Sequence, residues 1–162
     1  MRILKVDKSA GIMTEREVLD FLGKEREMMR LAMLDTDGYP LVHPVWFVYD
    51  DSRLWVTVER TGRKANLLRK TGKVYFTIDK ADPQIGSKGV RGRGVAELIE
   101  DNSLALDVIR KELLKYRGTL EDDYAKDFLG NVAPTQVVVK IRPLWFGAWD
   151  YGQPPKNRTQ GE

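Results

Sequence analysis

Short apolar segments separated by turn-forming residues run through most of the chain. Six of them are rich in β-branched and aromatic residues, which favour extended strands: residues 29–35, 41–49, 54–59, 73–79, 90–99 and 136–149. Residues 35–38, between the first two segments, are typical of a hairpin turn because Gly38 tolerates a positive φ. Many short strands joined by tight turns predict a mainly β fold, a small β-barrel with flanking helices.

Helical periodicity interrupts the strands in four places. The expected helices span residues 15–24, 63–70, 102–116 and 120–129. Thr14 and Glu17 have the spacing of a capping box at the start of the first helix. Asn102 or Ser103 is expected to cap the third helix. Pro143 is expected to interrupt the last strand, because proline lacks the N–H that a ladder needs.

Composition and charge limit the classes of function that the chain can have. The 162 residues are 42% hydrophobic and 31% charged, which predicts one globular domain over residues 1–152 and a polar tail over 153–162. Because 27 basic residues face 24 acidic ones, we expect no nucleic-acid partner. The absence of cysteine excludes disulfides and thiolate metal sites. No apolar run approaches the roughly 20 residues of a membrane span, so we expect no membrane partner and a cytoplasmic location.

Two adjacent cations stand at the expected start of the second helix. Arg63 and Lys64 follow the turn at Thr61-Gly62, where free backbone N–H groups carry the positive end of the helix dipole. Cations at this end oppose the dipole unless an anion binds there, so the pair predicts a dianion site. The alternative is a solvated surface pair, with Leu67 and Leu68 facing the core.

Several segments together resemble a known family. They are the TGRKA sequence at 61–65, the hairpin at 35–50, the strand at 54–58, the GVAE sequence at 94–97, and Arg142-Pro143 followed by Trp149. Over roughly residues 14–150 they resemble the pyridoxamine 5′-phosphate oxidase family. The resemblance implies an FMN-binding split barrel and a homodimer that holds the cofactor at its interface.

The resemblance also assigns residues to the cofactor. These are Val45, Trp46, Phe47, Thr57, Val58, Arg63, Lys64 and Trp149. The first three would border the isoalloxazine ring, the next two the ribityl chain, and the two cations would bind the phosphate. Trp149 would reach the flavin from the partner subunit. The three aromatic residues equally fit core or interface positions, as most strand aromatics do.

Other residues argue against different cofactors. Gly92 and Gly94 lie in a strand without a following helix, so they do not form a dinucleotide fingerprint, and a bulge or a close backbone approach explains them better. His43 is the only histidine, which leaves no metal cluster. No catalytic residue can be named.

The resemblance is weaker at the residues that would hold the substrate than at those that would hold the cofactor. The family's Arg and Lys on the second hairpin strand correspond to Val42 and Phe47, and its Arg-x-His pair has no counterpart in residues 150–157. We therefore expect an FMN-dependent oxidoreductase that acts on a small molecule other than the pyridoxine phosphate vitamer. The alternatives are a deazaflavin-dependent reductase, a non-catalytic flavin- or haem-binding module, and a nucleic-acid-binding barrel that uses its basic residues.

Overall fold

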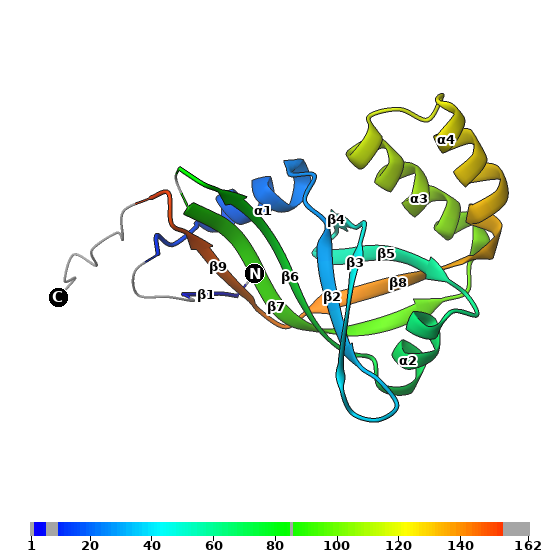
Figure 1. Cartoon of the computed structure of the whole chain (residues 1–162), viewed down its shortest axis with the longest axis horizontal. Coiled ribbons are helices and arrows are strands. Elements are labelled where there is room, and N and C mark those ends of the chain that lie inside the picture. Colours follow the sequence, from blue (N-terminus) through cyan, green and yellow to red (C-terminus); the bar gives the residue numbers. More distant parts are fainter. Residues whose placement is uncertain (1, 6–9, 85, 154–162) are drawn as a thin grey trace.

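Among the residues that the structure describes, the strands form one nine-stranded sheet. The computed structural model describes residues 2–5, 10–84 and 86–153 (Figure 1), so most of the predicted polar tail lies outside the described residues. The strands are β1 Ile3–Lys5, β2 Met29–Leu34, β3 Pro40–Val45, β4 Val48–Asp50, β5 Arg53–Glu59, β6 Lys73–Asp82, β7 Gly86–Ile99, β8 Gln136–Pro143 and β9 Phe146–Asp150. The prediction of a mainly β fold is confirmed.

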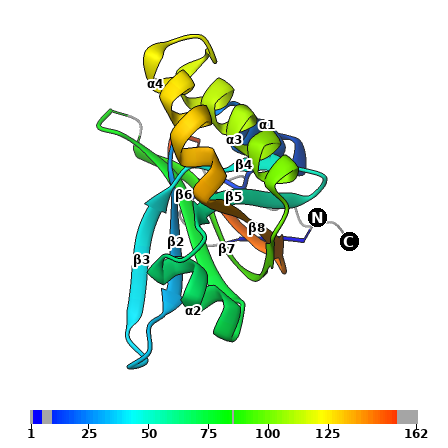
Figure 2. The same ribbon diagram turned by 90° about the vertical axis from the view of Figure 1, so that its right-hand side faces the viewer.

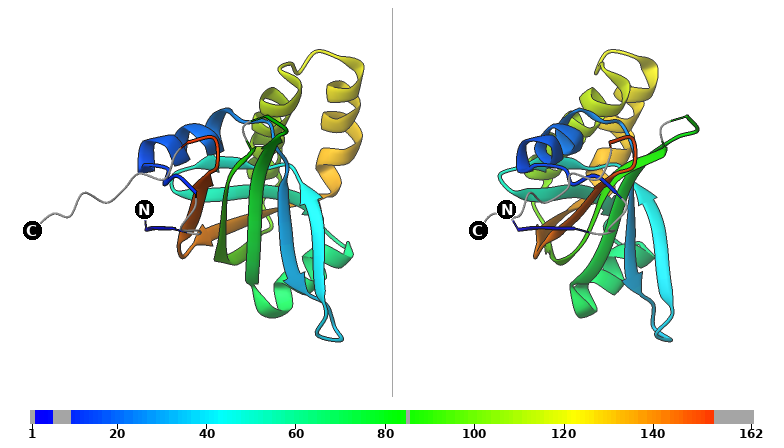
Figure 3. Two further views of the ribbon diagram at one scale, coloured as in Figure 1. Left: turned by 60° about the vertical axis from the view of Figure 1, so that its left-hand side comes forward. Right: turned by 90° about the vertical axis from the view of Figure 1, so that its left-hand side faces the viewer.

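Four α-helices flank the sheet in the described part of the chain. They are α1 Glu15–Lys24, α2 Arg63–Thr71, α3 Asn102–Arg117 and α4 Asp123–Asp127, and a π-helical turn at Phe128–Val132 extends α4. In Figures 1 and 2, α3 and α4 lie together, while α2 stands apart from them near the end of β5. Figure 3 shows α1 at the opposite end of the molecule from α2. No helix among the described residues is long and apolar enough to cross a membrane.

Strand β7 is long enough to pair with β9 along its first part and with β8 along its last part. The strand order is β3-β2-β6-β7-β8-β5-β4, and β9 pairs with both β7 and β1. Residues 88–91 of β7 pair with β9, and residues 94–99 pair with β8. Between them, a Cβ on Gly92 would collide with the Trp145 carbonyl oxygen and the Phe76 ring. The predicted close backbone approach is thus confirmed, and it lets one strand serve both neighbours.

Several boundaries differ from the sequence prediction; β6 and β7, for example, are longer than the predicted strands over 73–79 and 90–99. The strand predicted over 41–49 divides into β3 and β4, because the Phe47 N–H donates to the Tyr116 hydroxyl (3.3 Å) instead of to a neighbouring strand. Asp101 caps α3, where its carboxylate accepts the Leu104 N–H at 3.0 Å. The helix predicted over 120–129 begins only after its cap at Asp122. The expected capping box of α1 is present, and β8 ends at the expected proline.

Side-chain alternation along β5 separates the core from the outer face of the sheet. Leu54, Val56 and Val58 are buried inside the barrel, so Trp55 and Thr57 point to the opposite side. Helix α3 packs against this outer face, where its Ala105 and Val108 join Trp55 and Val138 in one cluster. The packing of α3 on β5 determines what lies above Thr57.

Candidate functional site

A groove of about 200 Å³ opens between the end of β3, β5, α2 and the α3–α4 pair. Its apolar side consists of Met28, Pro44, Val45, Trp46, Tyr124 and Phe128. Its polar side consists of Thr57, Lys64, Glu112 and Gln136. Four of the eight residues predicted to contact a cofactor therefore line one groove: Val45, Trp46, Thr57 and Lys64.

Trp46 forms the aromatic wall of the groove. Its ring stacks on Tyr116 of α3, with the centroids 5.0 Å apart and the planes 6° from parallel. It also lies 6.3 Å from the Phe128 ring, centroid to centroid. Tyr116 accepts a hydrogen bond from the Phe47 N–H and donates one to the Glu27 carbonyl (3.2 Å). These contacts hold the link between β3 and β4 against α3, which fixes the position of the indole.

The start of α2 forms the cationic end of the groove. Gly62 occupies the N-cap position and no side chain caps the helix, so the N–H groups of its first turn have no intrahelical acceptor. Lys64 is half-buried in the groove wall and makes no hydrogen bond or ion pair within the described part of the chain. Arg63 is mostly exposed, and its Nη2 lies 3.5 Å from Asp35 Oδ2 in the β2–β3 turn.

His43 lies close enough to this cationic end for the two positive charges to affect its pKa. Burial is the main cause that lowers the pKa of its imidazole, and the positive charges of Lys64 and Arg63 lower it further. The imidazole on β3 is therefore close enough to both cations to register their charge. This arrangement gives the sole histidine of the chain a direct electrostatic link to the predicted anion site.

Glu112 is the carboxyl group of the groove. Its side chain is 2% exposed, and its two oxygens lie 2.9 Å from Thr57 Oγ1 and 3.3 Å from Thr57 N. Burial raises the pKa of Glu112 to about 8, against the opposing effect of the Thr57 hydrogen bonds. One helical turn further on, burial lowers the pKa of Lys115 to about 8. The Lys115 ammonium lies over the Phe47 ring and donates to the Leu22 carbonyl at 2.9 Å.

Three other predicted residues present their side chains elsewhere. Phe47 and Val58 are 0% and 2% exposed and belong to the core inside the barrel. Trp149 is not among the residues that line the groove, and its indole N–H donates to Ser87 Oγ at 3.0 Å. The side chains of Phe47 and Val58 are thus turned away from the groove, and only their backbone could face a ligand.

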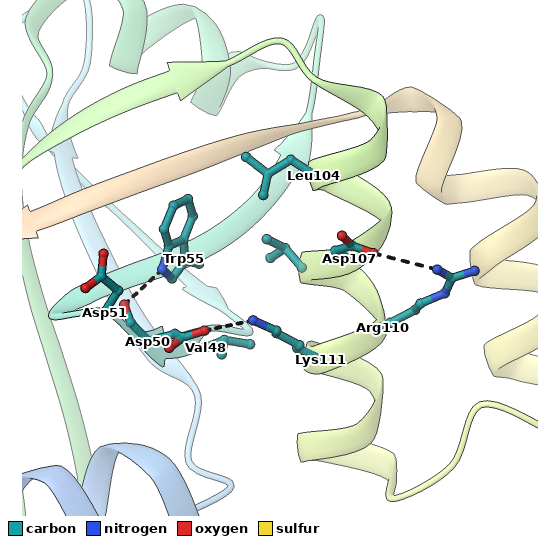
Figure 4. Close-up of a pocket in the computed structure, with 9 residues that line it drawn as sticks. Val48, Asp50, Asp51, Trp55, Leu104, Asp107, Arg110 and Lys111 are labelled. Atoms are coloured by element: carbon teal, nitrogen blue, oxygen red, sulfur yellow. Dashed lines mark hydrogen bonds and ion pairs between the residues drawn. The ribbon is translucent and has the colours of Figure 1, made fainter.

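A second, larger cavity of about 340 Å³ lies on the same outer face of the sheet, between α3 and β4–β5 (Figure 4). Trp55 and Leu104 contribute to its walls, and Lys111 reaches across to Asp50 at 2.8 Å. Each cation labelled in Figure 4 is already paired with a carboxylate. None of the residues predicted from the sequence lines this cavity, so the smaller groove is the better candidate site.

A protein-family model matches most of the chain. The family model described as pyridoxamine 5′-phosphate oxidase matches residues 14–150, which include every strand from β2 to β9 and all four helices. The chain belongs to the pyridoxamine 5′-phosphate oxidase family. A search among curated proteins finds no match.

Solved structures share the split-barrel fold of the family. A conserved hypothetical protein, Rv2991 from Mycobacterium tuberculosis, is 25% identical with a TM-score of 0.78, and the match covers 93% of this chain and 94% of that one. An F420 reductase is 23% identical with a TM-score of 0.62, covering 78% and 94%. An FAD-binding protein from Mesorhizobium loti is 23% identical with a TM-score of 0.62, covering 83% and 92%. At these identities the last two comparisons show the fold alone.

Within this family fold, α3, α4 and β8 bring residues to the groove that were not predicted from the sequence. Of these residues, Glu112 carried the clearest signal in the sequence. It occupies the apolar face of α3, at the helical spacing of Val108, Ile109 and Leu113, and a carboxyl at such a position predicts either a partner or a function. Gln136 and Phe128 carried no comparable signal, because polar and aromatic residues at the ends of elements are common.

Proposed function

We propose that this chain binds FMN in the groove and acts as a flavin-dependent oxidoreductase on a small molecule. The observation that carries the proposal is Lys64, a half-buried cation without a partner among the described residues, beside the uncapped start of α2. Bound phosphate would receive hydrogen bonds from the backbone N–H groups of the first turn and charge from Lys64. Arg63 would add its guanidinium group from the mouth of the site, next to Asp35.

The remaining walls suit the other parts of FMN. Thr57 offers a hydroxyl group in the groove wall, against which the ribityl chain would lie. Val45 and Trp46 offer an apolar surface for the ring, with the backbone of Phe47 beside them. The flavin would supply hydride exchange, while the protein would bind it, orient it and exclude water.

We further propose that the site is completed by a second copy of the chain. A groove of about 200 Å³ is smaller than the roughly 300–1,000 Å³ of typical ligand pockets, so one chain leaves a flavin largely open to solvent. Val42, Ala32 and Tyr75 form one cross-strand row, in which Val42 is 54% and Tyr75 40% exposed. An exposed apolar row of this kind favours a homodimer, with Trp149 facing the partner's groove.

A deazaflavin coenzyme is the second candidate ligand. The structure named as an F420 reductase shares this fold, and a deazaflavin coenzyme would also offer a hydroxyl-bearing chain and a phosphate group to the cationic end. Parallel titrations with FMN and with the deazaflavin coenzyme would rank the two.

The phosphate site is tested by FMN binding to Lys64→Ala. Loss of a charge-assisted hydrogen bond, worth about 1.5–3 kcal/mol, corresponds to roughly ten- to 150-fold weaker binding. The matched control is Lys70→Ala at the exposed C-terminal end of the same helix, which should bind FMN like the wild type. Flavin fluorescence quenching measures both. Equal affinity for wild type and Lys64→Ala would refute the phosphate assignment.

The dimer is tested by sedimentation of the FMN-loaded protein. Val42→Asp places a charge in the apolar row and is expected to give a monomer with weakened FMN binding. Leu19→Asp, on an α1 side chain that is 42% exposed and outside this row, should remain dimeric. A wild-type monomer that retains FMN would contradict the proposed interface.

A further inference from the structure

Glu112 makes two hydrogen bonds with Thr57, and only one of them can reverse its donor and acceptor. The Thr57 backbone N–H can only donate, so Glu112 Oε1, at 3.3 Å, must accept. Thr57 Oγ1 and Glu112 Oε2, 2.9 Å apart, can exchange the roles of donor and acceptor. The direction of this second hydrogen bond is therefore set by whether the carboxyl group holds a proton.

The surroundings favour the uncharged carboxyl group. Glu112 is 2% exposed, and no cation forms an ion pair with it in the described ranges. The titratable groups around it are Lys115 and Tyr116 on its own helix, Lys64 of α2 and Tyr124 of α4. Of these, Lys115 favours ionisation of the carboxyl, but desolvation outweighs it and the pKa of Glu112 rises to about 8.

The two protonation states leave Thr57 in different conditions. An uncharged carboxyl group donates through Oε2 to Thr57 Oγ1, so the threonine hydroxyl keeps its own hydrogen for another acceptor. An ionised carboxylate has no hydrogen to give, so it takes the hydrogen of the Thr57 hydroxyl. Only the first state lets Thr57 donate into the groove that its side chain lines.

We propose that Glu112 is a positioning residue that directs the Thr57 hydroxyl into the groove, where it donates to an acceptor oxygen of an anionic, hydroxyl-bearing ligand. The inference rests on the proposed function, since it specifies how the same groove holds the chain between ring and phosphate. Ionisation of Glu112 removes this donor and also brings a buried negative charge close to an anionic ligand. Binding therefore weakens as the carboxyl group loses its proton.

The test is FMN affinity, measured by fluorescence quenching at pH 7, 8 and 9. The phosphate of FMN is a dianion throughout this range, because its second pKa is about 6. For a carboxyl group of pKa about 8 that must be uncharged, wild-type affinity falls about tenfold between pH 7 and pH 9. Glu112→Gln should bind like the wild type at pH 7 and keep that affinity at pH 9, because its amide donates to Thr57 Oγ1 at every pH.

Three further variants separate this role from a structural one. Thr57→Val lacks the hydroxyl and should bind FMN about tenfold more weakly at pH 7, with a smaller fall to pH 9 than the wild type, because only the charge of Glu112 then opposes the ligand. Lys115→Arg keeps the positive charge beside Glu112 but does not titrate near pH 8, so it should keep the wild-type fall. Glu121→Gln, at a side chain that is 86% exposed, is the matched control and should also keep it.

The outcomes are distinguishable. Parallel pH profiles for wild type and Glu112→Gln would overturn the inference and leave the proposed function intact. Loss of the fall in Lys115→Arg alone would do the same. Absence of FMN binding by the wild type at pH 7 would overturn both. If Glu112→Gln does not fold, Glu112→Asp replaces it: withdrawal of the carboxyl from Thr57 should weaken binding at pH 7, and unchanged affinity and profile would overturn the inference.

Discussion

Replacement of Glu112 by Gln is expected to change how the stability of the free protein depends on pH. Burial raises the pKa of Glu112 from 4.5 to about 8 in the folded state. Between these two values the unfolded chain carries an ionised glutamate while the folded chain keeps the proton. The unfolded state then binds fewer protons, so the free energy of unfolding falls as pH rises toward 8.

The size of this effect follows from how far the pKa of Glu112 rises on folding. The difference between 8 and 4.5 is 3.5 pH units, and each unit corresponds to about 1.4 kcal/mol, which gives up to about 5 kcal/mol. Because Glu112 is 2% exposed, solvent screening reduces this figure little. Glu112→Gln does not titrate, so its stability relative to the wild type should rise by about 1.4 kcal/mol per pH unit until pH 8.

Urea unfolding at pH 5, 6, 7 and 8 measures this difference, with circular dichroism as the probe. The other titrating groups are common to both proteins and cancel in the comparison. Glu121→Gln, at the 86% exposed side chain, should run parallel to the wild type. A difference between Glu112→Gln and wild type that stays constant from pH 5 to pH 8 would refute the raised pKa and, with it, the uncharged carboxyl group on which the positioning of Thr57 depends.

Two further predictions use the sole histidine and the glycines. The pKa of His43 should rise when FMN or inorganic phosphate is added, because the anion offsets the charges of Lys64 and Arg63. The NMR signals of the imidazole measure this pKa. A fall in the pKa, or an unchanged value, would argue against an anion at this site. Gly92→Ala should cost about 1–3 kcal/mol in thermal unfolding, since its Cβ would lie 2.8 Å from Phe76 Cζ and against the Trp145 carbonyl. Gly23→Ala in α1, with nothing within 4 Å, should instead gain about 0.5–1 kcal/mol, and equal effects would contradict this account.

Local signals predicted most of the fold. The capping box at Thr14 and Glu17, the positive φ of Gly38 and the end of β8 at Pro143 each depend on a few consecutive residues, and the structure has all three. The N-cap of α3 was wrong by one residue, because Asp101 caps as well as the asparagine that follows it. β1 was not predicted, since three residues paired in parallel with β9 carry no pattern of their own.

The candidate site was predicted only in part, for a geometric reason. Consecutive residues of an extended chain point to opposite faces, so a motif that includes both Thr57 and Val58 can bring only one side chain to the groove. Inside the barrel, Val58 packs in the core, while Thr57 meets Glu112 on the outer face. Linear resemblance assigns both residues to the cofactor without distinguishing these faces.

The sequence by itself determined the type of the elements, the family resemblance and the cationic start of α2, because these depend on residues close together in the chain. Only the tertiary structure decided that Glu112 lies 2.9 Å from Thr57, 55 positions away, and that Lys64 shares a groove with Trp46. Burial depends on which elements pack together. The raised pKa of Glu112 is therefore a consequence of the packing of α3 on β5, and not of any local motif.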